Sequence, residues 1–169
     1  MNIFVVDPHP SLCAQCLDDR RLNKMIVETG QLLSSALWYW GADECVYVYR
    51  ESYKDHPCTK WVRKNMDNFV WTFSLFEEMI HERKIRGFGE HKSERIFPMF
   101  ENYIRRKGHH FWHIVRPGEF CNCSLYKDEE IFRAYMLTLQ EKWEAEENRG
   151  YIPQFTNRGK PWFYDKELG

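Results

Sequence analysis

The sequence lacks the features of a membrane or secreted protein. Its 169 residues contain no run of about 18 apolar residues, the length that a membrane-spanning helix needs, and its first ten residues lack the basic and apolar regions of a secretion signal. Six cysteines are too few to require a disulfide scaffold, so most of them are expected to be small buried hydrophobic residues in a reducing compartment. These absences predict a soluble, cytoplasmic protein.

A large excess of charge of one sign is also missing. Lysine and arginine together number 24, aspartate and glutamate number 25, and the formal net charge is -1. Seven of the acidic and four of the basic residues fall within residues 127–149, so the rest of the chain carries a small positive excess. Any affinity for nucleic acid must therefore come from a local basic patch and not from the field of the whole molecule.

Several familiar catalytic motifs are absent. The chain has no GxSxG and no HExxH motif, and the glycines at positions 87 and 89 do not follow a strand pattern, so they give no phosphate-binding loop. No cofactor and no metal are expected. Hydrophobic residues make up 43% of the chain, which is enough for a stable core, and the length suits one domain over residues 1–169.

What the sequence does contain is helical periodicity. Apolar residues three and four positions apart predict helices over residues 22–40, 59–83, 96–104 and 128–148, with Ser11 as an N-cap before the first of them. Residues 3–6 are expected to be extended against the core, residues 46–49 to be a short strand or an extended link, and residues 109–124 to be an ordered loop. The prediction is an all-α, compact single-domain bundle of about four helices, with ordered aromatic-rich loops and a C-terminal tail.

Charged residues of opposite sign share one face of the first predicted helix. Arg20, Lys24 and Glu28 lie four positions apart, and Arg21 flanks them. Cations beside a carboxylate suit the anchoring of a phosphate next to an acid or base. An exposed face with ordinary ion pairs explains the same spacing.

Two further segments combine basic residues with histidine or aromatic rings. Residues 53–57 end in His56-Pro57 at an expected helix start, which suits either a phosphate or flipped base or a simple structural turn. After three basic residues at 105–107 come His109, His110 and His113 with Phe111 and Trp112, a pattern that suits stacking on distorted or single-stranded nucleic acid. A basic helix end that leads into buried rings is the alternative.

Four cysteines form two closely spaced pairs. Cys13 and Cys16 are two residues apart, and one residue separates Cys121 from Cys123, so the four together are a conceivable zinc site. The spacing of the second pair is unusual for zinc, and packing inside a helix explains the first pair equally well.

Short motifs along the chain are similar to those of a known family. The opening MNIFVVDPHP, a Leu-x-x-x-Arg element at residues 17–21, Tyr-Lys-x-His-Pro at 53–57 and Arg-x-x-Pro-Trp-Phe-Tyr at 158–164 resemble the pyrimidine-dimer DNA glycosylases of the endonuclease V type. The opening, Lys-Met-x-x-Glu-Thr at 24–29 and His-Pro-Cys-Thr at 56–59 also resemble a group of small phage proteins. If the chain is encoded by a phage, its place is the host cytoplasm.

The resemblance implies a helical DNA repair enzyme whose N-terminal amine is the nucleophile and whose first helix supplies a carboxylate. Such an amine attacks the sugar, expels the base and leaves a Schiff base that is open to strand cleavage. An α-amino group titrates at about 7.7 to 8.0, well below a lysine at about 10.4, so more of it is neutral at physiological pH. Asn2 is a poor second residue for methionine removal, so the amine is expected to be that of Met1. Asp19 and Glu28 are the nearest carboxylates, and Glu28 is favoured because it shares a face with the cations.

We therefore predict a monomeric DNA N-glycosylase with AP-lyase activity that acts on double-stranded DNA containing a damaged or modified pyrimidine. Its predicted catalytic residues are Met1, Glu28 and Asp19. Its predicted DNA-binding residues are Arg20, Arg21, Lys24, His56, Lys60, Arg63, Arg158, Trp162, Phe163 and Tyr164. The rings at 162–164 would stack on or wedge the duplex during base flipping. The alternatives are a non-catalytic nucleic-acid-binding module, with or without zinc, and a phage adaptor that binds a host protein through residues 128–148.

Overall fold

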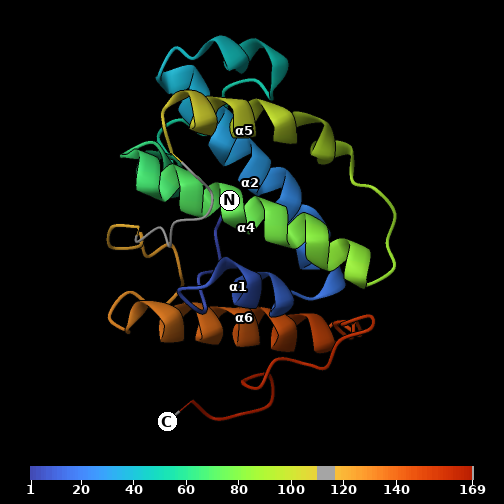
Figure 1. Cartoon of the computed structure of the whole chain (residues 1–169). Coiled ribbons are helices and arrows are strands. Elements are labelled where there is room, and N and C mark those ends of the chain that lie inside the picture. Colours follow the sequence, from blue (N-terminus) through green and yellow to red (C-terminus); the bar gives the residue numbers. More distant parts are fainter. Residues whose placement is uncertain (110–116, 169) are drawn as a thin grey trace.

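The protein is all-α, as the periodicity predicted, and two long helices form its centre. The computed structural model describes residues 1–109 and 117–168, and no strand occurs in those two ranges. Its α-helices are α1 (Pro10–Gln15), α2 (Asp19–Tyr39), α3 (Pro57–Val62), α4 (Met66–Ile85), α5 (Phe97–Arg106) and α6 (Ile131–Glu147). Two 3₁₀ helices, η1 (Asp43–Tyr47) and η2 (Lys92–Ile96), precede α3 and α5. Figure 1 shows α2 and α4 crossing at the centre, with α5 on one side and α1 and α6 on the other.

Helix α2 begins after a buried N-cap residue, Asp18, and packs against the core through an apolar face. The Asp18 carboxylate accepts a hydrogen bond from the backbone N–H of Arg21 at 3.1 Å, which satisfies one of the unpaired donors of the first turn. The stripe predicted from the sequence is buried from Leu22 to Leu37. Gly30 lies within it, and a Cβ there would come within 3.2 Å of both Ile96 and Tyr49. The close approach of neighbouring elements to α2 therefore depends on a missing side chain.

The single helix predicted over residues 59–83 is two helices. Helix α3 ends at Val62, and α4 begins at Met66 after Asn65, whose side chain accepts a hydrogen bond from the N–H of Asn68 at 2.8 Å. The apolar residues on both sides of the break face the core, so the period continues across it. The prediction was wrong here because the Asn65 side chain offers the backbone a cap that competes with continued helix.

The first residues of the chain are buried, as expected of residues 3–6. Val5 is fully inaccessible, and Ile3 and Val6 are almost so. The N-cap of α1 is His9 and not Ser11, because Pro10 occupies the first helical position, where its missing N–H does no harm. This burial packs residues 3–6 against the core, while Met1 and Asn2 are half-buried; the N label overlies the middle of the molecule in Figure 1.

Helix α6 and the C-terminal tail share an aromatic cluster. The Trp143 ring lies 5.8 Å from that of Phe163 and 4.8 Å from that of Tyr164, both stacked, and it contacts Phe155 edge-on at 5.7 Å. The indole N–H of Trp143 donates to the buried Asp18 carboxylate at 2.9 Å. One tryptophan therefore joins the tail, α6 and the start of α2.

The remaining elements differ from the predictions only in detail. Residues 46–49 form no strand, since η1 runs to Tyr47. Helix α6 starts at Ile131, because the Glu130 side chain caps it, and not at residue 128. Part of the predicted loop over residues 109–124 lies outside the described residues. None of the helices in residues 1–109 and 117–168 combines the length and apolar character of a membrane span.

Candidate functional site

The α-amino group of the chain lies beside a carboxylate of α2. The Met1 nitrogen is 3.6 Å from Oε2 of Glu28, and the backbone N–H of Asn2 donates to the same oxygen at 3.2 Å. The second oxygen, Oε1, faces the Lys24 ammonium at 3.4 Å. Glu28 thus holds the first two residues of the chain with one oxygen and an exposed cation with the other.

Asn2 shapes the chain start around this carboxylate. Its Oδ1 accepts hydrogen bonds from the N–H groups of Ile3 at 2.8 Å and Phe4 at 3.4 Å, and its Nδ2 donates to the carbonyl of Cys123. Phe4 has a φ of 41°, a left-handed conformation that non-glycine residues rarely adopt. The Asn2 oxygen stabilises this sharp turn, and the turn presents the amine to α2.

A cavity of about 480 Å³ opens in front of the amine, and basic side chains outnumber acidic ones in its lining. Helix α2 provides one wall and α6 the other, with the first residues of the chain between them. The lining residues are Met1, Asn2, Phe4, Arg20, Arg21, Lys24, Met25, Glu28, Lys142, Ala145, Glu146 and Arg149. Five basic side chains thus outnumber two acidic ones. The volume falls within the range of about 300 to 1,000 Å³ that is usual for small-molecule sites.

Two of the three predicted cations on α2 are accessible, and the third is part of the interior. Arg20 and Lys24 are about two-thirds exposed, at 66% and 69%. The Arg21 guanidinium is mostly buried between Asp18 at 2.6 Å and Glu146 at 2.9 Å. Its charge is already paired on both sides, so Arg21 supports the cavity wall and is not free to hold a phosphate.

The sequence reasoning missed the basic residues that the end of α6 brings to the cavity. Lys142 of α6 and Arg149, two residues after the last helical residue Glu147, line it together with Ala145. The acidic excess of residues 127–149 concealed these cations.

Asp19 takes part in a buried ion-pair network and not in the cavity. Its Oδ1 accepts from the Arg86 guanidinium at 2.8 Å, and its Oδ2 accepts from the Thr156 hydroxyl at 2.6 Å. The same arginine pairs with Glu82 at 2.8 Å. Every oxygen of Asp19 is therefore occupied by a structural partner, and Glu28 is the carboxylate that lies at the amine.

The predicted DNA-binding residues of the second segment lie around α3. His56 is the N-cap, and its Nδ1 accepts from the N–H of Cys58 at 3.1 Å. Lys60 is 55% exposed and 3.6 Å from Asp55, and the Arg63 guanidinium lies 4.1 Å from the centre of the Tyr39 ring. The cations are close to solvent, and the histidine is tied to its own helix.

The C-terminal motif divides between surface and core. Trp162 is 61% exposed, whereas Phe163 is inaccessible and Tyr164 is 8% exposed. Arg158 pairs with Glu82 at 2.7 Å. Phe163 and Tyr164 are thus core residues and Arg158 is paired with a buried carboxylate, so Trp162 is the residue among these four with a mostly exposed side chain.

The described residues include only the first histidine of the histidine-rich segment, His109. His110, Phe111, Trp112 and His113 lie outside the described residues. The preceding Arg106 pairs with Asp43 at 2.8 Å and Glu44 at 2.7 Å. Its charge is therefore balanced within the fold.

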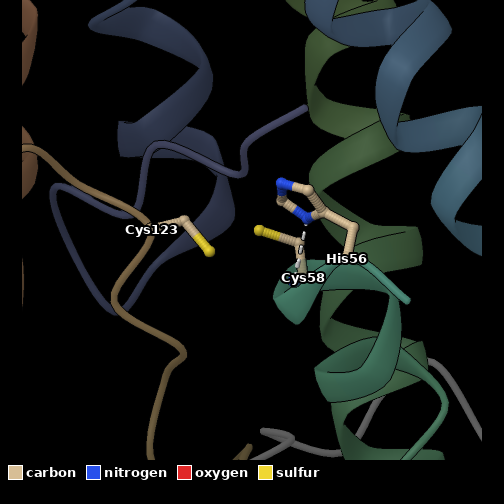
Figure 2. A group of neighbouring side chains, drawn as sticks. All are labelled: His56, Cys58 and Cys123. Carbon is tan, nitrogen blue, oxygen red and sulfur yellow. Dashed lines mark hydrogen bonds between the residues drawn. The ribbon is translucent and has the colours of Figure 1, made fainter. Parts of the chain in front are cut away.

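The cysteines do not group as the sequence suggested. Cys13 is buried in α1, and its thiol donates to the Asp7 carbonyl at 3.1 Å. The side chains that meet are His56, Cys58 and Cys123, whose ligand atoms all lie within 4.8 Å of one another (Figure 2). Cys58 was missed as a candidate, although its position two residues after a histidine at a helix start was a usable signal.

A second cavity, of about 580 Å³, lies along α4 and the start of α5 and has an acidic character. Glu77, Glu78 and Glu94 line it with His81 and Lys84. Burial raises the pKa of Glu77, and the neighbouring carboxylates raise it further. A surface of this charge repels a phosphate backbone, so the cavity at the N-terminus is the better candidate for DNA.

A comparison with protein families identifies the family to which the chain is similar. A family model described as pyrimidine dimer DNA glycosylase matches residues 1–95, more than half of the chain. The matched part includes the N-terminus, α2 and α3. No curated protein and no solved structure matches the chain.

Proposed function

We propose, from the premise that this chain belongs to the pyrimidine dimer DNA glycosylase family, that it excises a damaged pyrimidine from duplex DNA by using the Met1 amine as nucleophile. The observation that carries the proposal is the 3.6 Å separation between that amine and the Glu28 carboxylate at a basic cavity. An amine beside a carboxylate in a phosphate-attracting cavity has the parts that attack on a sugar carbon requires.

The chemistry conserves atoms and electrons. The neutral amine attacks C1′ of the deoxyribose, a C–N bond forms, and the bond from C1′ to the base breaks. The base leaves with the bonding electron pair and takes up a proton, while the attacking nitrogen loses one. Ring opening then gives an imine between Met1 and C1′, with no oxidant or reductant required.

Strand cleavage follows from the same intermediate. Removal of a proton from C2′ of the imine expels the 3′ phosphate oxygen, and water then releases the amine. Glu28 is suited to stabilise the cationic sugar and to move these protons, because its Oε2 faces the attacking nitrogen. Lyase activity is thus a consequence of the nucleophile's being an amine.

The basic side chains around the amine would attract the phosphate groups of DNA. Arg20 and Lys24 on α2 flank the cavity on one side, and Lys142 on α6 with Arg149 just after that helix flank it on the other. Phosphate groups on either side of a flipped nucleotide would meet cations at both walls. We propose the exposed Trp162 ring as a further contact that replaces lost base stacking.

The experiment is borohydride trapping on ultraviolet-irradiated duplex DNA. We expect a covalent adduct that peptide mass spectrometry maps to the Met1 amine, together with release of the damaged base. A variant with two residues added before Met1 is the matched control, because each added residue moves the amine by about 3.8 Å and takes it away from Glu28. Absence of both adduct and released base on irradiated and base-modified duplexes would overturn the proposal, as would an adduct that maps to a lysine.

A further inference from the structure

Four soft ligand groups converge next to the N-terminal site. His56 and Cys58 come from the start of α3, and Cys123 comes from the loop before α6; Figure 2 shows the two sulfur atoms pointing toward one another below the imidazole ring. The Cys121 sulfur adds a fourth group, at 3.7 Å from the Cys58 sulfur. Two separate segments of the chain, about 60 residues apart, thus bring one imidazole and three thiols together.

The spacing and the donor set fit a tetrahedral zinc ion. With a zinc–sulfur bond of about 2.3 Å, two sulfur atoms on the same tetrahedral zinc are about 3.8 Å apart, which is close to the separation of Cys58 and Cys121. Thiolate and imidazole ligands without carboxylates select zinc over magnesium, calcium or manganese. We propose that His56, Cys58, Cys121 and Cys123 bind one structural zinc ion.

The imidazole is held over the first turn of α3, because its Nδ1 accepts the N–H of Cys58 at 3.1 Å. A metal bound by this histidine would join that turn to the loop that carries Cys121 and Cys123. The thiols release their protons to solvent on binding, so the affinity rises with pH.

The zinc ion would fix the wall on which the chain start rests. The Cys123 carbonyl accepts from the Asn2 side chain, and the Thr59 hydroxyl, one residue after Cys58, donates to the Met1 sulfur at 3.8 Å. The buried Tyr135 of α6 also bridges the loop, since its hydroxyl accepts from the Cys123 N–H and donates to the Cys121 carbonyl. The ion would therefore couple α3 and the loop to the residues that position the amine, without touching the amine itself.

The experiment is elemental analysis of the intact protein, purified under reducing conditions from zinc-supplemented cells. We expect about one zinc per chain in the wild type, and less than about one-tenth of that in Cys58→Ser and Cys123→Ser. Cys45→Ser is the matched control, because Cys45 is buried in η1 outside the cluster, and it should retain the wild-type zinc content.

A second measurement covers the case in which the variants fail to fold. Cobalt added to chelator-treated wild-type protein should give the intense visible bands of a tetrahedral thiolate site, and zinc should displace it. Zinc well below one per chain in the wild type, with no such bands, would overturn the proposal. So would a disulfide between Cys58 and Cys121 that persists in reductant, or equal zinc loss in Cys45→Ser. Because these readouts do not depend on base release, they succeed or fail independently of the proposed glycosylase activity.

Discussion

Replacing Glu28 by glutamine removes the charge beside the amine and leaves most of the local geometry in place. The amide oxygen of glutamine still accepts the Asn2 N–H, which bonds Oε2 at 3.2 Å in the wild type. The chain start should therefore stay where it is, and the effect on catalysis should come from the lost charge.

The distance between the amine and the carboxylate sets an upper limit on the size of that effect, because the sugar lies beyond the amine. Two unit charges 3.6 Å apart attract by about 4.6 kcal/mol at an effective dielectric constant of about 20. The sugar carries only part of a positive charge in the transition state, and Lys24 at 3.4 Å offsets part of the Glu28 field. About 3 kcal/mol remains, which is roughly a hundredfold in rate and lies within the range measured for the loss of one electrostatic stabiliser.

The assay is single-turnover base release from an ultraviolet-irradiated duplex with enzyme in excess. We expect Glu28→Gln to be slower by about 10²-fold with little change in DNA affinity. Glu90→Gln, on an exposed loop away from the cavity, should match the wild type and controls for the loss of one negative charge. A Glu28→Gln rate within twofold of the wild type, alongside a fully inactive N-terminally extended variant, would refute the role given to the carboxylate.

Three further outcomes test other parts of the structure. Lys142→Ala and Arg149→Ala should each weaken DNA binding and lower the slope of log affinity against log salt by about 1, as measured by titration at several salt concentrations. Trp162→Ala should weaken DNA binding by about 1 to 3 kcal/mol and leave stability unchanged, whereas Phe163→Ala should destabilise the fold by about 3 to 5 kcal/mol in urea unfolding. Burial would raise the pKa of Glu82, but hydrogen bonds from two arginines outweigh it and hold that pKa below its usual range. The stability from this charge is then complete above the ordinary glutamate pKa of about 4.3 and is lost as the pH falls through the lower folded value, so acid should destabilise the wild type more than Glu82→Gln.

The parts of the fold that the sequence predicts are those that depend on local spacing. The apolar stripe of α2 and the shared face of Arg20, Lys24 and Glu28 both follow from 3.6 residues per turn, and both are present. The break at Asn65 was not predicted because the apolar period passes through it unchanged. A single capping side chain decided the outcome there.

The parts of the site that the sequence does not predict depend on contacts between distant segments. Trp162 and Phe163 are neighbours of similar chemistry, and only the packing of the tail on Trp143 decides which of them is buried. Cys58 and Cys121 are 63 residues apart, and nothing in their local spacing pairs them. The local sequence pattern therefore predicted the α2 wall of the cavity. The opposite wall depends on tertiary packing, which the pattern does not show.

The division of the cavity between the two ends of the chain bears on how the protein is made. Met1 is synthesised before the opposite wall of the cavity, which includes Arg149 just after α6; that residue follows at least 7 to 30 s later at about 5 to 20 residues per second. Until then the amine has only the α2 half of its surroundings, with two of the four flanking cations still to come. A chain truncated before α6 should therefore bind DNA more weakly than the full chain, because it lacks two of the four cations that flank the cavity.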